Sequence, residues 1–388
     1  MKRLILVLLF VSLLWGCSAQ PPAVTEPTTT TQTEPSTVTE PTTVTEPSVT
    51  EPPVTEPPVT EPPVTEPPEP ELPESVSITL SFTGDCTLGT NQEHSYYNSF
   101  HQYYDRKGPD YFLSKVRSIF QEDDLTVVNL EGSLTNSNDL VVKTWNHKGP
   151  PEYVNILSAS SVEVATMGNN HRLDYNVSGC LETEQVLTEA GIDYCYDGNY
   201  LIREVQGIKV GFVSVNEVYD GEAVMTWLKN GYRWLREQNC ALVIACVHWG
   251  ENHTPELLPT QLTMGDKLID LGYDLVIGNH PHVLQAMRVY KGKFICYSLG
   301  NFCYGGSKNP KDKDSGIFQQ TFTFVDGVLQ PQIDARFIPC SLSGKTDLND
   351  YRPVPSKGEE FDRIIQKIND YSLEFDFAWN PDGTYTSA

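Results

Sequence analysis

The strongest constraint on the fold of this chain is a set of short polar motifs that each follow an apolar run of strand length. Three of them place histidine beside glycine or asparagine: GNNH at 168–171, VHWG at 247–250 and GNHPH at 278–282. Two upstream motifs, TGD at 83–85 and NLEG at 129–132, add carboxylates in the same setting. His, Asn, Asp and Glu side chains at strand ends are the groups from which two-metal hydrolytic sites are built. The first hypothesis is therefore a metal-dependent hydrolase.

The order of the apolar runs predicts strands that alternate with helices. Strands are expected at 76–82, 125–130, 162–167, 208–215, 241–247, 275–277 and 294–299, and helices at 111–120, 150–158, 179–190, 223–238 and 259–271. A late antiparallel pair, 317–325 and 332–338, is expected around Asp326-Gly327. This pattern is typical of an α/β domain with a mixed sheet, in which ligands bind beyond the carboxyl ends of the strands. All five polar motifs fall at that edge, and their agreement carries more weight than any one of them.

Residues 1–17 have the features of a secretory signal. Lys2 and Arg3 precede an apolar run that is too short for a comfortable membrane span, and LWGC at 14–17 resembles a bacterial lipobox. In such a motif the cysteine, here Cys17, is lipidated and becomes the new N-terminus. A plain cleaved signal and an uncleaved anchor stay open as alternatives. All three place the protein on the extracellular side of the cell membrane.

Residues 18–75 are predicted to form a disordered stalk rich in Pro, Thr and Glu. The segment repeats Val-Thr-Glu-Pro, has no aromatic residue and no Lys or Arg, and cannot bury a core. Dense proline and evenly spaced glutamates favour an extended chain, with a reach on the order of 150 Å at about 3.1 Å per residue. We expect a stalk that carries a lipid-anchored domain through a cell wall; a spacer of no fixed length is the simpler alternative.

The remaining residues are numerous enough for one large domain with its own core. We place this domain at 76–345 and a helical C-terminal extension that packs on it at 346–388, because apolar residues between Phe361 and Tyr371 follow helical spacing. The chain has a net charge of −24, and the eleven glutamates of the stalk and the two basic residues of the leader leave about −15 on the domain. This acidity argues against nucleic acid, and against an anionic membrane surface, as a partner of the domain.

The eight cysteines after Cys17 include no CxxC pair, so a structural zinc ribbon is not supported. Three of them, Cys240, Cys246 and Cys296, lie in or beside apolar runs, where a free thiol behaves as a small hydrophobe. We therefore expect mostly buried free cysteines. The chain also lacks a GxSxG elbow and a P-loop, so a serine hydrolase or a kinase is not supported.

Six residues are candidate metal ligands: Asp85, Glu131, Asn170, His248, His280 and His282. The most specific signal is His280-Pro281-His282, because alternate residues of an extended segment project to the same side. His171, beside Asn170, is the candidate general acid. Each residue alone also has an ordinary explanation as a turn, a cap or a polar group at the end of a core strand.

Other residues receive supporting roles. Asn129 shares a strand face with Glu131, and Trp249 supplies a stiff wall beside His248. The remaining histidines are expected at the surface, although the pair His147-Lys148 could touch an anionic substrate; they are His94, His101, His147 and His253.

These motifs resemble the CapA family of capsule synthesis, also called the poly-γ-glutamate capsule biosynthesis domain, a branch of the calcineurin-like metallophosphatase superfamily. The resemblance runs from about Ile78 to Ile338 and is carried by FTGD at 82–85, NLEG at 129–132, GPPE at 149–152, GNNHRLDY at 168–175, HWG at 248–250, GNHPH at 278–282 and SLGNF at 298–302. It implies a four-layer, metallophosphatase-like α/β/β/α sandwich with mixed sheets. It also places the six candidate ligands in the ligand positions of the superfamily, with His171 as the general acid. Substrate-binding or supporting roles are assigned to Asn129, Lys148, Asn169, Asp174, Trp249 and Asn301.

The sequence departs from the superfamily at the first two motifs. Metallophosphatases usually open with Asp-x-His, whereas this chain has Asp85-Cys86-Thr87, and Glu131 stands where their second motif usually carries aspartate. Gly168 stands where the CapA family often has alanine. The cofactor expected from the resemblance is therefore one or two divalent ions of Mn, Fe or Zn.

The resemblance implies an extracellular, lipid-anchored hydrolase that attacks a phosphoester or an amide or γ-glutamyl bond. Its expected partners are an anionic capsule polymer, such as poly-γ-glutamate, or the complex that synthesises or exports it, and the membrane through the N-terminal lipid. The alternative is a non-catalytic subunit of that complex, which uses the same site to hold polymer ends.

Overall fold

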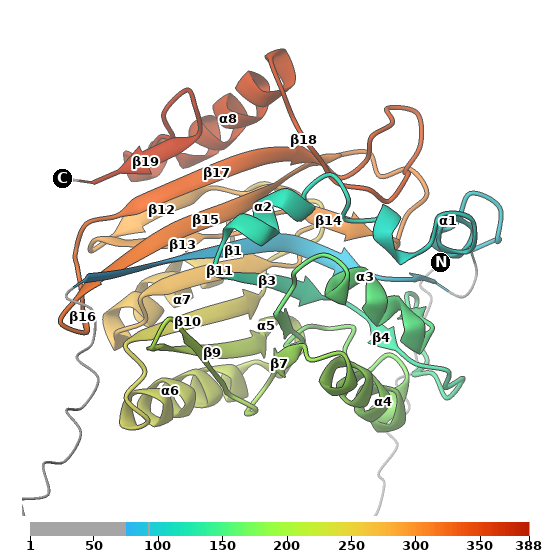
Figure 1. The fold of residues 1–388 in the computed structure, drawn as a ribbon, viewed down its shortest axis with the longest axis horizontal. Coiled ribbons are helices and arrows are strands. Elements are labelled where there is room, and N and C mark those ends of the chain that lie inside the picture. The colour runs from blue at the N-terminus through green and yellow to red at the C-terminus, as the bar shows by residue number, and fades with distance from the viewer. Residues whose placement is uncertain (1–74, 92–93, 388) are drawn as a thin grey trace, which may run out of the picture. The chain divides into compact units, whose positions relative to one another are not determined.

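The computed structural model describes residues 75–91 and 94–387. The predicted leader, the lipidation site Cys17 and the stalk lie outside these residues. Two large mixed β-sheets form the centre of the described domain, with helices on their outer faces (Figure 1). A small third sheet lies beside them and consists of β2 (Thr90–Asn91), β5 (His147–Gly149) and β4 (Ser133–Leu134).

The first large sheet combines four parallel neighbours with an antiparallel group. Its main path runs β18 (Val354–Pro355), β17 (Asp334–Ser341), β15 (Asp314–Val325), β1 (Ser75–Thr87), β3 (Leu125–Leu130), β6 (Val164–Thr166) and β7 (Asp193–Cys195). Three short strands attach to this path: β14 (Asn301–Tyr304) to β1, β16 (Val328–Leu329) to β15 and β19 (Thr384–Thr386) to β17. Strands β1, β3, β6 and β7 are parallel, so their carboxyl ends meet at one edge.

The second large sheet is also parallel at its centre. Its order is β12 (Met287–Tyr290), β13 (Lys293–Cys296), β11 (Leu275–Asn279), β10 (Leu242–His248), β9 (Ile208–Asn216) and β8 (Leu201–Val205). Strands β9, β10, β11 and β13 are parallel, and β8 and β12 pair antiparallel at the two edges. Every residue of β10 and β11 is buried, as expected for parallel strands that are covered on both faces.

Three apolar layers explain why the chain stacks in this way. One core lies between the sheets and joins residues such as Phe82 and Phe318 of the first sheet to Ile244 and Ile277 of the second. A second core packs the outer face of the first sheet under helices, and a third packs the outer face of the second sheet in the same way. The predicted four-layer α/β/β/α sandwich is therefore confirmed.

The helices that cover the sheets are mostly short. Those that precede β7 in the sequence are α1 (Phe100–Lys107), η1 (Pro109–Tyr111), α2 (Arg117–Glu122), η2 (Pro151–Tyr153), α3 (Val154–Ser158) and α4 (Asn176–Glu189). Those that follow strands of the second sheet are α5 (Glu217–Asp220), α6 (Glu222–Glu237) and α7 (Pro259–Leu271). None of the helices within the described ranges combines the length and the apolar character needed to cross a membrane.

The last α-helix, α8 (Glu359–Ser372), and the short 3-10 helix η3 (Leu373–Phe375) lie between β18 and β19 in sequence. Figure 1 shows α8 along the edge of the sandwich, above β17 and close to β12. Ile364, Ile365 and Ile368 on this helix enter the core between the two sheets. The helix therefore closes one side of that core.

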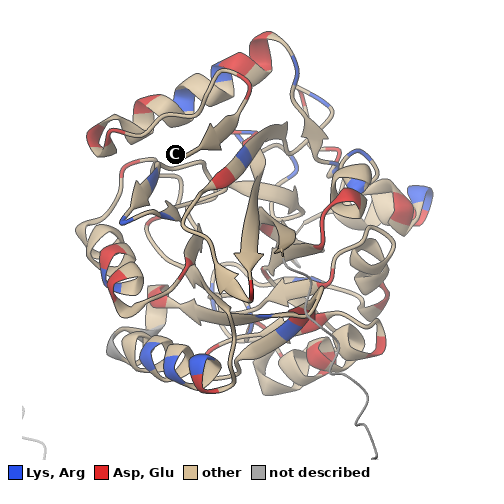
Figure 2. Cartoon of the chain, turned by 60° about the vertical axis from the view of Figure 1, so that its left-hand side comes forward, with Lys and Arg blue, Asp and Glu red and all other residues tan. Residues whose placement is uncertain are grey.

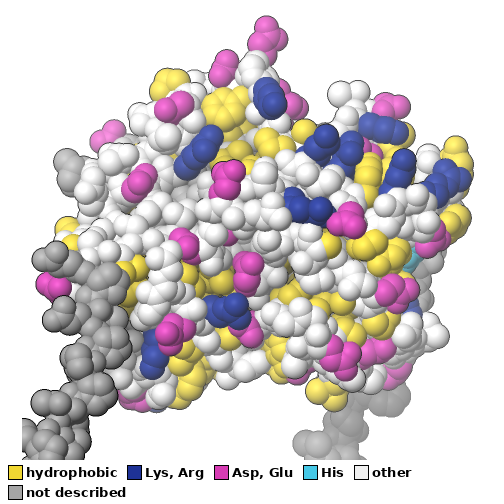
Figure 3. All heavy atoms as spheres, in the orientation of Figure 1, with side chains coloured by type: hydrophobic (Ala, Val, Ile, Leu, Met, Phe, Trp, Pro, Cys, Tyr) yellow, Lys and Arg dark blue, Asp and Glu magenta, His cyan; other side chains and the backbone are white. Residues whose placement is uncertain are grey.

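Charged residues lie mainly on the helices and loops, and the strands carry few of them (Figure 2). On the face drawn in Figure 3, acidic and basic side chains are interspersed. All eight cysteines of the described domain are free and buried, as the sequence predicts.

Most predicted elements are found, with two instructive differences. The helix expected at 111–120 is broken: residues after η1 form turns, and only α2 is α-helical, although Phe112, Leu113 and Val116 are fully buried. The strand expected at 294–299 ends at Cys296, and β14 follows Gly300, whose φ of 70° turns the chain. The hairpin turn at Asp326-Gly327 is confirmed, with φ values of 50° and 74°.

Candidate metal centre

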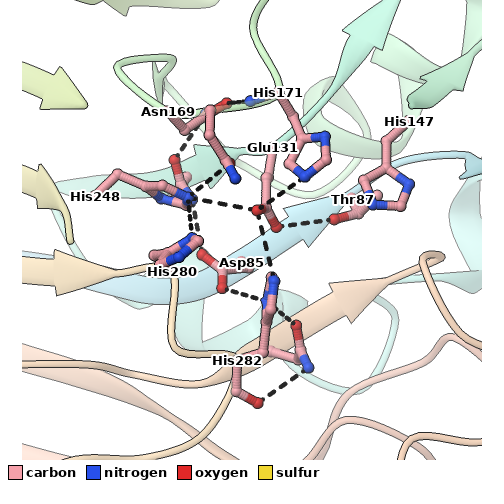
Figure 4. A network of polar contacts seen from close by, with 12 residues as sticks. Asp85, Thr87, Glu131, His147, Asn169, His171, His248, His280 and His282 are labelled. Atoms are coloured by element: carbon pink, nitrogen blue, oxygen red, sulfur yellow. Dashed lines mark hydrogen bonds and ion pairs between the residues drawn. The ribbon is translucent and has the colours of Figure 1, made fainter. Parts of the chain in front are cut away.

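The carboxyl ends of both large sheets supply the candidate site, and the two sheets supply different chemistry (Figure 4). The first sheet provides mainly carboxylates and amides: Asp85 in β1, Asn129 and Glu131 at the end of β3, and the motif 169–171 after β6. The second sheet provides imidazoles: His248 at the end of β10, and His280 and His282 after β11. The strand register holds the two halves in place, because Asp85 pairs with Asn129 and His248 with Asn279.

A close backbone approach positions Asp85. The Asp85 amide donates a hydrogen bond of 2.8 Å to the carbonyl of Gly300. A Cβ atom on Gly84 would lie 1.9 Å from that same carbonyl oxygen, so only glycine fits before Asp85. This explains the TGD motif in packing terms.

The HxH motif has a different conformation from the one that the sequence predicts. An extended segment was expected, but His280 and His282 have φ values of 100° and 60°, which non-glycine residues rarely adopt. Pro281 between them lies in a bend, and both rings still reach the cluster, with centroids 5.9 Å apart. Such strained backbone persists only where the surroundings hold it, and it is concentrated at functional sites.

Glu131 lies at the centre of the cluster and is fully buried. Its Oε1 atom lies 3.5 Å from Nε2 of His248, 3.8 Å from Nε2 of His282 and 3.9 Å from Nε2 of His171. This oxygen has no hydrogen-bond partner among the described residues. A buried carboxylate oxygen that faces imidazole nitrogens beyond hydrogen-bond distance is an arrangement that calls for a cation.

The spacing of these atoms fits a metal ion. Two ligand atoms that each lie about 2.0–2.2 Å from one ion are roughly 3–4 Å apart. Glu131, His280 and His282 each offer an atom within 4.8 Å of the others, and Nδ1 of His280 lies 3.1 Å from Nε2 of His248. The donor set of imidazoles and carboxylates suits Zn, Fe or Mn.

The remaining two candidate ligands also face the cluster. Oδ2 of Asp85 forms an ion pair of 2.9 Å with Nδ1 of His282. Oδ1 of Asn170 lies 3.1 Å from Nε2 of His248. The structure therefore brings all six predicted ligands together.

Three asparagines and a threonine orient these groups. Asn129 donates to Asp85 at 2.8 Å, and Asn169 donates to Asn129 at 3.1 Å. Oδ1 of Asn301 lies 3.0 Å from Nδ1 of His282. Thr87, at the position where the superfamily usually has histidine, donates to Oε2 of Glu131 at 3.2 Å.

His171 is oriented by a carboxylate in the same turn. Its Nδ1 lies 2.7 Å from Oδ2 of Asp174, and its Nε2 points toward Glu131. Lys143 forms an ion pair with Asp174 and donates to the carbonyl of Asn170 at 2.8 Å. Sequence reasoning missed Lys143, because an isolated lysine in a polar loop has no distinguishing pattern.

Burial decides the protonation of most imidazoles. Burial lowers the pKa of His248 and of His171 to about 3, and that of His280 to about 2. Burial also acts to lower the pKa of His282, but the charge of Glu131 and the hydrogen bond to Asp85 outweigh it and raise this pKa to about 9. Neutral imidazole is the form that binds metal, so two of the three candidate ligand rings, His248 and His280, are ready to do so at neutral pH.

Two predicted residues lie apart from the cluster. Trp249 is fully buried in the core beneath the helices of the second sheet and donates to the carbonyl of Tyr297 at 2.8 Å. The Lys148 ammonium donates to Ser137 and Asn138 and lies over the ring of Tyr175. Trp249 thus stiffens the strand end from below.

The surface position expected for His147 is wrong. This residue is only 4% exposed, and its ring lies 4.3 Å from the ring of His171. Its position in β5 brings it inward, because β5 pairs with β2 close to the end of β1. The third sheet is too short to leave a pattern in the sequence, so the burial of His147 could not be predicted.

A cleft of about 790 Å³ opens above the cluster. Its walls include residues of the site together with groups from several loops, among them His94, Trp145, His147, His171, His253, His282, Asn301, Tyr304, Lys311 and Asp312. The cleft gives a ligand access to the buried centre.

Comparison with known proteins agrees with the resemblance seen in the motifs. The family described as bacterial capsule synthesis protein PGA_cap matches residues 79–305, which is more than half of the chain. The chain belongs to this family. The CapA-type assignment from the sequence is thereby confirmed.

Individual relatives are distant. The chain is 25% identical over 272 residues to the capsule biosynthesis protein CapA of Bacillus anthracis, covering 63% of this chain and 64% of that protein, slightly less than two thirds of its length. It is 24% identical over 338 residues to the PGA biosynthesis protein CapA of Bacillus subtilis (strain 168), covering 80% and 82% of the two chains. A solved structure of a hypothetical protein from Thermus thermophilus aligns with a TM-score of 0.41 and 16% identity over 68% of this chain and 99% of that one.

Proposed function

We propose that this CapA-type protein is a metal-dependent hydrolase of capsule or poly-γ-glutamate synthesis. The observation that carries the proposal is Oε1 of Glu131, a buried carboxylate oxygen without a hydrogen-bond partner among the described residues that faces three imidazoles. A divalent cation would satisfy this oxygen and the strained histidines together.

The proposed ligands are the six that converge: Asp85, Glu131, Asn170, His248, His280 and His282. They would hold one or two ions of Mn, Fe or Zn. When bound, such an ion supplies Lewis acidity and lowers the pKa of water. The protein contributes the fixed geometry, because hydrogen bonds with Asn129 and Asn301 limit how Asp85 and His282 can turn.

His171 is the proposed general acid, which donates a proton to the leaving group. Asp174 accepts a hydrogen bond from Nδ1, so the free Nε2 points toward the cluster, where a proton is taken up and passed on. The same carboxylate stabilises the imidazolium form once the ring has been protonated. The bond attacked is a phosphoester or an amide or γ-glutamyl bond.

The setting of this activity is proposed from the sequence and from the names of the relatives. A lipid on Cys17 would anchor the protein at the extracellular side of the membrane, and residues 18–75 would carry the domain through the cell wall. The relatives are named for capsule and PGA biosynthesis. The proposed partner is therefore an anionic capsule polymer or the complex that synthesises or exports it.

The test is the metal content of the purified protein, followed by hydrolysis of phosphoesters and γ-glutamyl peptides. We expect bound Mn, Fe or Zn, and we expect His282→Ala to lower the metal content while the circular dichroism spectrum stays unchanged. His101→Ala is the control, because this histidine does not line the cleft and is not a proposed ligand. A folded protein that binds none of these metals would contradict the hydrolase proposal. It would favour the alternative function, a non-catalytic subunit that holds polymer ends.

A further inference from the structure

His147 is a buried imidazole that has no place in the proposed metal set. It lies in β5, and its backbone amide donates a hydrogen bond of 2.6 Å to Oδ2 of Asp174. A Cβ atom on Gly132 would lie 3.2 Å from Cβ of His147, so the residue after Glu131 has to be small to admit it. The backbone thus fixes this side chain against the catalytic turn.

One ring nitrogen of His147 is left unsatisfied by the described residues. Its Nδ1 atom is buried and lacks a hydrogen-bond partner among the described residues. A histidine that serves only to fill a core normally has its nitrogens satisfied. Here the side chain lines the cleft together with His171 and His282. Figure 4 shows the His147 ring on the same side of Glu131 as the His171 ring.

The surroundings of His147 favour an anion over a second cation. Lys143 forms an ion pair with Asp174 and lies 3.5 Å from Nδ1 of His171, whose ring packs on His147. The Lys143 ammonium offsets the charge of Asp174, so this carboxylate does not favour a metal ion at His147, and an entering anion meets an ammonium as well as a carboxylate. Burial and the neighbouring His171 lower the pKa of His147 well below its ordinary value, so the ring is neutral and keeps one N–H donor.

The lining of the whole cleft also favours an anion, relative to the rest of the domain. Five of the eight histidines of the chain line it, together with Lys311 and a single carboxylate, Asp312. This composition stands out in a domain that is otherwise strongly acidic. The lysine and the aspartate of the lining balance each other, so an anionic group meets less repulsion in the cleft than over the acidic rest of the domain.

We propose that His147 donates a hydrogen bond to an oxyanion of the substrate, a phosphate or carboxylate oxygen, beside His171. This inference rests on the proposed hydrolase function and adds a substrate-binding residue to it. The bound oxygen would lie on the leaving-group side of the site, because that is where Nε2 of His171 delivers its proton.

The experiment measures binding of inorganic phosphate, and in a second arm of glutarate, to the metal-loaded full chain by calorimetry. His147→Phe keeps a ring against His171 but removes both nitrogens, and we expect it to weaken binding about tenfold or more. His147→Gln keeps a donor and should recover most of that loss. His101→Phe, which changes an imidazole outside the cleft, is the control and should bind like the wild type. The arm with the larger loss identifies the oxyanion.

Metal content and melting temperature distinguish a substrate-binding role of His147 from a metal-ligand role and from a purely structural one. All variants should keep the metal content of the wild type, and His147→Phe should melt at or above the wild-type temperature because no hydrogen bond of the described residues is lost. Unchanged affinity in His147→Phe would overturn the inference, with or without a lower melting temperature. A fall in metal content would also overturn it, because His147 would then be a ligand. A wild-type protein without metal defeats the hydrolase proposal itself, which is a different result.

Discussion

The first sheet carries carboxylates at both ends of its parallel strands, and the two ends use them differently. At the amino ends, Asp124 accepts a hydrogen bond of 2.8 Å from the amide of Thr79, and Glu163 accepts one of 2.8 Å from the amide of Thr126. At the carboxyl ends, Glu131 accepts one hydrogen bond, from Thr87, and its other oxygen faces only imidazoles.

This difference separates carboxylates that stabilise the fold from carboxylates that are held for a ligand. Those at the amino ends satisfy backbone amides that would otherwise lack partners. Those at the carboxyl ends stay incompletely satisfied at a cost in stability, which natural proteins tolerate mainly at functional sites. The comparison predicts that equal substitutions at the two ends have opposite consequences.

The largest effect is expected from the matched pair Glu131→Gln and Glu163→Gln. Glu131→Gln removes the charge at the centre of the proposed metal set and should abolish metal binding, with any hydrolysis falling at least about 1000-fold. Glu163→Gln should keep the metal and the activity and change stability by no more than about 1 kcal/mol, because the amide oxygen still accepts the hydrogen bond from Thr126 and the weaker bond is offset by removal of a charge whose burial raises the pKa of Glu163. Metal analysis and urea unfolding measure the two outcomes.

The comparison would fail if both variants lost the metal, since that would show a general loss of structure. It would also fail if Glu131→Gln kept a full complement of metal. In that case the unpartnered oxygen of Glu131 would have another cause, and the ligand assignment would have to change.

A smaller effect is expected from Asp174→Asn at the same end of the sheet. An amide at this position can donate to Nδ1 of His171, which would move the proton of the ring to Nε2 and spoil its acceptor role. We expect kcat to fall about 100- to 10,000-fold while metal content stays at the wild-type level. Metal analysis and steady-state kinetics on the same preparation test this. A parallel loss of metal would show that Asp174 supports the ligands instead of His171.

The sequence predicted the part of the site that depends on strand ends. Asp85, Glu131 and His248 each follow an apolar run, and parallel strands place such residues at one edge without further information. Asn170 and His171 received their roles from their residue types, the resemblance gave them the same roles, and the structure brings both residues to the cluster.

The parts that could not be predicted depend on short or irregular segments. His147 and Lys143 reach the site from β5 and the loop before it, and a three-residue strand leaves no periodic signal. His280 and His282 have positive φ values, which the surrounding contacts impose. The residue types His-Pro-His do not by themselves predict this backbone conformation. Both the position of β5 and the backbone conformation of the HPH motif depend on contacts between residues far apart in the sequence. Such contacts cannot be inferred from the residue pattern of a single sequence.

The smallest effect concerns Asp123, at the amino ends of the strands beside Glu163. Burial, with added repulsion from Glu163 and Asp124, raises the pKa of Asp123 from 3.8 to about 7. Between these two values the folded protein binds a proton that the unfolded chain releases, so the free energy of unfolding should fall as pH rises from about 4 to about 7. Asp123→Asn should flatten this part of the profile, because the amide does not titrate and can still accept the hydrogen bond of 2.7 Å from Thr126. Urea unfolding of wild type and variant across this range measures the slope, with the exposed neighbour Glu122→Gln as the control. If Asp123→Asn left the slope unchanged, the buried charge of Asp123 would carry no cost, and the amino-end carboxylates would differ from those at the carboxyl ends even more clearly than the structure indicates.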